Sequence, residues 1–182
     1  MTKNLVAVVT IREGSERVKE KNFKPFAGKN LLEHKIEVLK KVKKLDEIII
    51  NTDSDRAIEI AKKYDVKPQR REEYYASSKC SNSEFWEHIG KTTEANYIMF
   101  THCTNPLIEV ETYNKFVEIF EENKNKNDSI NTVTDVKDFL YLENKPLNFD
   151  PKKAPGSQNL PNIIKLNFFI NILSTDLMEK KK

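Results

Sequence analysis

The chain has 182 residues, with 31 lysines and arginines against 28 aspartates and glutamates and a formal net charge of +3. This length suits one domain with its own core, and the modest charge gives no support for a nucleic-acid or membrane partner. No apolar run approaches the roughly 20 residues that span a bilayer. The two cysteines and three histidines show no metal-ligand or disulfide spacing. The N-terminal segment enters a strand pattern without a signal-peptide layout, so a cytoplasmic protein is expected.

The N-terminal segment joins an apolar strand pattern to a cationic loop. Residues 5–11 read LVAVVTI, and the loop that follows carries Arg12, Gly14 and Lys21. Glycine lets the backbone approach an anion closely, and the two cations supply positive charge. This pattern predicts a phosphate site, although the loop has no Walker A sequence and its glutamates leave a solvated loop as the alternative.

Helix-like and strand-like segments then alternate along the chain. Apolar residues recur at helical spacing over 32–42, 57–64, 85–89 and 110–120, and in the first of these segments Lys and Glu are expected on the opposite face. Strand patterns occupy 47–52, 65–71, 97–101 and 129–134, and Ser54 is a good N-cap for the second helix. The alternation predicts an α/β fold with a mostly parallel, Rossmann-like sheet and helices on both faces.

Three polar segments follow strands of this predicted sheet. They are residues 12–22, 52–55 and 101–106. Ligands of such sheets bind beyond the carboxyl ends of the strands, so we expect the three segments to converge on one edge and form a binding site.

The pattern changes after residue 135. Residues 139–149 read FLYLENKPLNF, which predicts a β-hairpin with its turn at Asn144–Lys145, and residues 150–162 hold three of the seven prolines. An apolar strand returns at 163–173, and Ser174 or Thr175 could cap a short final helix. We therefore predict an α/β domain at 1–135, a hairpin insertion at 136–162, and a return strand and helix at 163–182. The hairpin either forms a dimer contact or packs on its own domain.

Six segments in order resemble motifs of the acylneuraminate cytidylyltransferases, also called CMP-sialic acid synthetases. They are VTIREGSERVKEKN, GKNLLEHKI, EIIINTDSDRAIEIAKKYDV, RREEYYASSKCSN, FTHCTNPLI and QNLPNIIKLNFFINI. The first is similar to the family's I-P-A-R-x-G-S-K-x-x-x-x-K-N loop. The resemblance covers nearly the whole chain and implies a nucleotide-binding domain with a nucleotidyltransferase-type fold.

The resemblance also implies roles for individual residues. Those expected to hold the CTP phosphates are Arg12, Ser15, Arg17 and Lys21, with Arg12 and Lys21 also acting in catalysis. Those expected around the nucleoside are Asn22 and, at the cytosine, Arg71, Cys80, Ser81 and Asn82. Those expected toward the sugar are His102, Thr104, Asn105 and Asn167.

The implied reaction transfers CMP from CTP to an acidic α-keto sugar, such as a sialic acid-like nonulosonic acid, and releases pyrophosphate. The implied partners are CTP, the acidic sugar and a second copy of the chain in a homodimer. Mg2+ is the implied cofactor. Which acidic sugar is used is left open.

The sequence also departs from the family pattern. Phe168 stands where the motif has glycine, which should narrow the sugar pocket, and the chain ends before the family's acidic D-x-D segment that binds Mg2+. Asp53 is then the candidate metal ligand, or else a residue of the strand–helix turn. Two alternative functions follow: a weak or inactive nucleotide-binding relative, or another nucleotide-sugar enzyme of similar fold, such as a glycosyltransferase.

Overall fold

The computed structural model describes residues 2–14 and 18–179. Contacts divide the chain into two compact units. The first comprises Met1–Ile130 and Phe169–Lys182, and the second comprises Asn131–Phe168.

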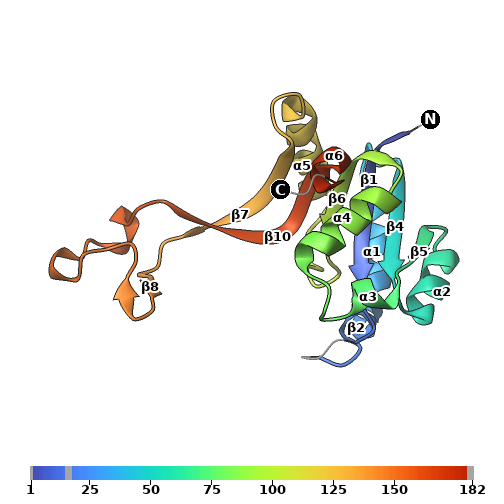
Figure 1. Cartoon of the computed structure of the whole chain (residues 1–182), viewed down its shortest axis with the longest axis horizontal. Coiled ribbons are helices and arrows are strands. Elements are labelled where there is room, and N and C mark those ends of the chain that lie inside the picture. Colours follow the sequence, from blue (N-terminus) through green and yellow to red (C-terminus); the bar gives the residue numbers. More distant parts are fainter. Residues whose placement is uncertain (1, 15–17, 180–182) are drawn as a thin grey trace. The chain divides into compact units, whose positions relative to one another are not determined.

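A six-stranded sheet has the order β5-β4-β1-β6-β10-β7 (Figure 1). The strands are β1 (Lys3–Ile11), β4 (Glu47–Thr52), β5 (Lys67–Arg70), β6 (Ala95–Thr101), β7 (Ser129–Val136) and β10 (Ile163–Ser174). Strand β1 pairs in parallel with β4 and β6, β4 pairs in parallel with β5, and β10 runs antiparallel to β6. The predicted mostly parallel α/β sheet is confirmed.

The described helices are α1 (Leu31–Leu39), α2 (Asp55–Lys63), α3 (Glu73–Ala76), α4 (Asn82–Thr92), α5 (Val110–Asn123) and α6 (Thr175–Glu179), with short 3-10 turns η1 (Lys21–Phe23), η2 (Pro151–Lys153) and η3 (Ser157–Asn159). Four of the described helices (α1, α2, α4 and α5) follow the apolar periodicity of the sequence, whereas the short helix α3 was not predicted. Ser54 is the N-cap residue of α2, as predicted, but its side chain makes no capping hydrogen bond. Asn30 and Ser81 instead form capping boxes at the starts of α1 and α4.

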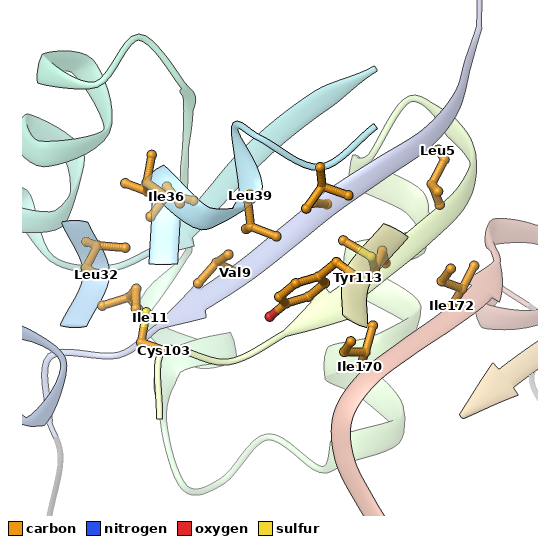
Figure 2. Packing of buried hydrophobic residues seen from close by; sticks show 14 of the residues in the cluster. Leu5, Val9, Ile11, Leu32, Ile36, Leu39, Cys103, Tyr113, Ile170 and Ile172 are labelled. Carbon is orange, nitrogen blue, oxygen red and sulfur yellow. The ribbon is translucent and has the colours of Figure 1, made fainter. Parts of the chain in front are cut away.

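Alternate residues of β1 face two separate cores. Leu5, Val9 and Ile11 pack in the cluster that α1, α2 and α5 cover, which Figure 2 shows from close by. Val6 and Val8 pack in a second cluster with residues of α4 and α6. Successive side chains of a strand point to opposite faces, so a strand buried on both faces reads as the continuous apolar run seen in the sequence. The predicted helices on both faces are confirmed.

A small hairpin follows η1 and was not predicted. Strands β2 (Pro25–Phe26) and β3 (Lys29–Asn30) pair antiparallel around Ala27 and Gly28, both with positive φ (48° and 80°). Two-residue hairpin turns of this kind need positive φ at both positions, which Gly28 adopts without strain.

The second unit contains the predicted hairpin. Strands β8 (Tyr141–Leu142) and β9 (Lys145–Pro146) pair antiparallel, and the turn residues are Glu143 and Asn144, one position earlier than predicted. Both have positive φ, 49° and 62°, which is the conformation that a two-residue turn requires. In the part of the chain that is described, no helix has the length and apolar composition needed to cross a bilayer.

Candidate functional site

The three polar segments that follow strands meet at one edge of the sheet. Strands β1, β4 and β6 are parallel, with Ile11 opposite Thr52 and Val9 opposite Thr101. The carboxyl ends of these strands therefore lie together, and the segments beginning at Arg12, Asp53 and His102 leave from the same edge. The predicted convergence is confirmed.

The loops after β1 and β4 are tied directly to each other. The backbone N–H of Glu13 donates to Asp53 Oδ1 at 3.0 Å. Arg12 is half-buried, and its guanidinium reaches the carbonyl oxygen of Ala76 at 3.4 Å. One carboxylate oxygen of Asp53 thus orders the start of the cationic loop, which places Arg12 between the ends of β1 and α3.

Arg71 is buried against the end of β4. Its guanidinium donates to the side-chain oxygen of Asn51 at 2.6 Å and to the Asn51 carbonyl at 2.7 Å, and it lies 4.9 Å from the centre of the Phe85 ring. Burial lowers the pKa of Arg71 to about 10, with Asp53 opposing and Arg12 adding to the shift. Arg71 therefore remains charged at neutral pH and lies near both Arg12 and Asp53, while two of its donors are occupied by Asn51.

The segment expected to face cytosine forms the start of α4. The Ser81 hydroxyl accepts from the backbone N–H of Glu84 at 3.2 Å and donates to the Glu84 carboxylate at 2.6 Å. Cys80 is half-buried, and burial raises the pKa of its thiol. Asn82 is exposed as the first residue of the helix. Ser81 thus has a structural role as a helix cap, and cytosine contacts by these residues stay a prediction.

The 3-10 turn η1 at the end of the cationic loop brings a lysine close to the loop after β6. Lys21 and Asn22 are half-buried in η1. Burial lowers the pKa of His102, and the positive charges of Lys21 and Lys35 lower it further. His102 is therefore neutral at pH 7, and Lys21 lies within electrostatic reach of the loop that was expected to face the sugar.

The loop after β6 is held from behind by α1. Lys35 donates to the carbonyl oxygen of Asn105 at 3.0 Å, and a ring nitrogen of His34 lies 2.9 Å from the carbonyl oxygen of Pro106. Thr104 is exposed on this loop, and Asn105 is half-buried. The lysines of α1 were expected on its solvent face, and for Lys35 this was wrong, because its side chain is fully buried. The sequence did hold a signal for this burial: Lys35 stands three residues after Leu32, on the same face of α1 as its buried apolar residues.

The structure does not place the remaining predicted residues at this edge of the sheet. Ser15 and Arg17 lie outside the described residues. Asn167 belongs to the second unit, where its side chain accepts from Thr132 at 2.6 Å and donates to Thr134 at 3.0 Å. Phe168, at the motif's glycine position, has φ +54°, the left-handed conformation that glycine adopts most readily.

The described side chains form no Mg2+ site made of protein ligands alone. Mg2+ demands near-octahedral geometry, but it usually keeps several waters and is bound by one or two carboxylates together with substrate phosphates. No group of three or more His, Cys, Asp or Glu side chains able to hold a metal occurs among residues 2–14 and 18–179. Asp53 offers a single carboxylate, and one of its oxygens already accepts from Glu13. A metal role for Asp53 stays a prediction, and no step below is assigned to a metal.

Known proteins resemble this chain in sequence. Over 130 residues it is 28% identical to a pseudaminic acid cytidylyltransferase of Campylobacter jejuni subsp. jejuni serotype O:23/36 (strain 81-176), covering 68% of this chain and 56% of that protein. Over 88 residues it is 31% identical to an N-acylneuraminate cytidylyltransferase of Escherichia coli O18:K1:H7 (strain RS218 / NMEC), covering 48% of this chain and 21% of that protein. The chain thus spans about half the length of the pseudaminic acid relative.

Solved structures share the fold. A CMP:2-keto-3-deoxy-manno-octonic acid synthetase complexed with CTP superposes with a TM-score of 0.72 at 15% identity, covering 97% of this chain and 76% of that one. A 4-diphosphocytidyl-2C-methyl-D-erythritol synthase of Anaerococcus prevotii DSM 20548 superposes with a TM-score of 0.66 at 17% identity, covering 97% of this chain and 74% of that one. The family model described as cytidylyltransferase matches residues 6–161. With most of its length matched by that model, the chain belongs to the cytidylyltransferase family.

Proposed function

We propose that this protein transfers CMP from CTP to an acidic α-keto sugar and releases pyrophosphate. The observation that carries the proposal is the common sheet edge from which the segments beginning at Arg12 and His102 leave, with Lys21 within electrostatic reach of His102. Membership of the cytidylyltransferase family supports CTP as the nucleotide substrate. The sequence similarity to pseudaminic acid and N-acylneuraminate cytidylyltransferases supports an acidic α-keto sugar as the second substrate.

In this reaction an oxygen of the sugar, its anomeric hydroxyl, attacks the α-phosphorus of CTP. The bond between the α-phosphorus and the bridging oxygen to the β-phosphate breaks, pyrophosphate leaves, and the hydroxyl proton is lost to water. Phosphoryl transfer depends mainly on alignment and on stabilisation of the charge at the phosphate oxygens. Arg12 can bind phosphate oxygens in a bidentate manner, and Lys21 supplies a compact positive charge.

Other residues are proposed to contact the rest of the two substrates. The proposed phosphate contacts also include Ser15 and Arg17, and the proposed contact to the nucleoside is Asn22. The proposed cytosine contacts are Arg71, Cys80, Ser81 and Asn82, and the proposed sugar contacts are His102, Thr104, Asn105 and Asn167.

Pyrophosphate release with a matrix of nucleotides and sugars tests the function. CTP, UTP and ATP are each combined with pseudaminic acid, N-acetylneuraminic acid and 2-keto-3-deoxy-manno-octonic acid, with and without Mg2+. We expect release with CTP to exceed release with UTP or ATP by at least about a hundredfold, because a wrong base leaves buried hydrogen-bonding groups unpaired.

The other outcomes separate the alternatives. Release with UTP or ATP in place of CTP would favour another nucleotide-sugar enzyme. Binding of CTP by calorimetry without release from any sugar would contradict the proposed reaction and favour a nucleotide-binding relative.

We also propose that the second unit forms a homodimer contact. It carries large apolar side chains that are 43–61% exposed, namely Phe139, Tyr141, Leu142, Leu147, Ile164 and Leu166. Apolar surface gathered in one small unit is typical of a protein–protein interface.

Sedimentation equilibrium tests the dimer. We expect the wild-type chain to sediment as a dimer and the double variant Tyr141→Glu/Leu142→Glu to sediment as a monomer, because burying two carboxylates at an apolar contact is strongly unfavourable. Leu107→Glu is the matched control, since Leu107 is 84% exposed in the first unit. A monomeric wild type, or a double variant that stays dimeric, would show that these residues do not form the contact.

A further inference from the structure

Lys35 is a fully buried lysine in the first unit. It lies on the apolar stripe of α1 with Leu32 and Ile36, and its side chain has no exposed surface. Its ammonium group donates to the hydroxyl of Tyr113 at 2.6 Å and to the carbonyl oxygen of Asn105 at 3.0 Å. Lysine is almost never fully buried unless it is paired, so this position requires an explanation.

The hydrogen bonds continue beyond Lys35 into the sheet. The Tyr113 hydroxyl lies 2.7 Å from the Thr101 hydroxyl, which donates to the carbonyl oxygen of Phe169 at 3.1 Å. Figure 2 shows the Tyr113 ring within the core, near Val9 and Ile170. The chain of contacts therefore joins α1 and α5 to β6 and β10, directly behind the loop of residues 102–106.

The positive charge of Lys35 has no negative partner among its described contacts. Tyr113 on α5 and Cys103 on the loop are neutral at pH 7, because burial raises the pKa of each to about 12. His102 on the same loop is also neutral there, since burial and the two nearby lysines lower its pKa. Lys21 on η1 adds a second positive charge to this region. Burying a cation among neutral groups costs free energy that a bound anion would offset.

We infer that Lys35 is a positioning residue for the acidic substrate, fixing the 102–106 loop from behind and placing an uncompensated positive charge next to it. This inference rests on the proposed function. It assigns Lys35 to the sugar side because its backbone contact is with Asn105, in the loop proposed to face the sugar, whereas Arg12 and Lys21 are proposed for the CTP phosphates. His34, which contacts the next carbonyl, supports the loop from the same helix.

Sugar binding should depend on pH, because burial lowers the pKa of Lys35 from 10.5 to about 8 in the free protein. An anion beside the loop favours the charged form, so sugar binding at pH 8 should take up protons. Above this pKa the charge is lost and sugar binding should weaken. In the same range folding becomes more favourable: between about pH 8 and 10.5 the unfolded chain binds the Lys35 proton and the folded chain does not, so stability rises with pH.

Kinetics of Lys35→Met and of the wild type test the inference. At saturating CTP, we expect Lys35→Met to raise the KM for the sugar by about tenfold or more, because the 102–106 loop loses its charged anchor and the nearby positive charge, with the KM for CTP within about twofold. From one pH unit below the Lys35 pKa to one unit above it, the wild-type KM for the sugar should rise by about tenfold, because the charged fraction falls from about nine-tenths to one-tenth. The variant should lack this rise, and Lys35→Arg should recover part of the affinity at both pH values.

The control is Lys40→Met. Lys40 also donates to a backbone carbonyl, that of Tyr64 at 2.8 Å, but it is exposed. We expect its kinetics to match the wild type. Thermal unfolding at pH 7 provides a second readout: Lys35→Met should melt no lower than the wild type, because an apolar side chain replaces an uncompensated buried charge.

Calorimetry of the wild type alone keeps the inference testable if Lys35→Met does not fold. Sugar is titrated into the CTP-bound protein at pH 8 in two buffers of different ionisation enthalpy, and we expect uptake of up to about half a proton per sugar bound. Sugar binding without proton uptake, or an unchanged sugar KM in Lys35→Met, would overturn the inference while leaving the proposed function intact. No pyrophosphate release by the wild type from any sugar would contradict the proposed function, and the inference with it.

Discussion

Alanine at Arg12 or at Lys21 should weaken CTP binding by about ten- to a hundredfold, because each change removes a charge-assisted contact worth about 1.5–3 kcal/mol. Both side chains are half-buried: Arg12 follows β1 at the edge where parallel strands β1, β4 and β6 end, and Lys21 lies within electrostatic reach of His102 at that edge. Partial burial matters here, since cations at such positions are screened less by salt than fully exposed ones. The measurement is calorimetric titration with CTP.

Lys19→Ala is the matched control for Lys21→Ala. Lys19 lies in the same loop and carries the same charge, but it is exposed, so its loss should change CTP affinity by no more than about threefold. Arg12→Lys should recover only part of the affinity lost in Arg12→Ala, because lysine cannot form the two parallel hydrogen bonds of a guanidinium. CTP binding that is unchanged in both alanine variants would remove Arg12 and Lys21 from the phosphate site and leave the loop as a solvated surface.

Arg71→Ala should lower the free energy of unfolding by about 3 kcal/mol, because it leaves two buried oxygen acceptors of Asn51 without their donors. Arg71 is 6% exposed, and Asn51 is fully buried in β4. Arg71 also lies over the ring of Phe85, so its removal loses packing as well as hydrogen bonds. Urea unfolding followed by fluorescence of Trp86, which packs against Phe100, measures the effect.

Arg70→Ala is the control for Arg71→Ala, and a double-mutant cycle measures the interaction energy between Asn51 and Arg71. Arg70 precedes Arg71 and contacts Asp55 and the Asp53 carbonyl, but its side chain is 54% exposed, so its loss should cost no more than about 1 kcal/mol. Asn51→Ala combined with Arg71→Ala should cost less than the sum of the two single changes, with a coupling of about 1–3 kcal/mol. A loss below about 0.5 kcal/mol in Arg71→Ala would mean that the guanidinium is not held as the structure shows it.

Arg71 also shows how structural and binding roles can be separated. CTP affinity of Arg71→Lys, measured well below its unfolding transition, reports on cytosine recognition independently of stability. A folded Arg71→Lys protein that still prefers CTP over UTP by the wild-type margin would assign base recognition to other residues of this edge.

The sequence by itself determined the fold class and the edge that holds the candidate site. Continuous apolar runs such as residues 5–11 mark strands buried on both faces, and apolar spacing over 32–42 and 110–120 marks helices, because these periodicities depend only on local backbone geometry. The rule that ligands bind beyond the carboxyl ends of parallel strands then selected Arg12, Asp53 and His102 together. Motif order along the chain pointed to the cytidylyltransferases.

Only the tertiary structure decided which polar side chains have hydrogen-bond partners within the protein and which residues those partners are. Lys35 was expected on a solvent face, yet it meets Tyr113, which is 78 positions away in the chain. The helix-capping role of Ser81 was not predicted, and neither was the β2–β3 hairpin, because its strands have only two residues each. Local patterns determine which face of an element turns inward, whereas the partner of a buried charge depends on contacts between distant segments, which only the folded chain brings together.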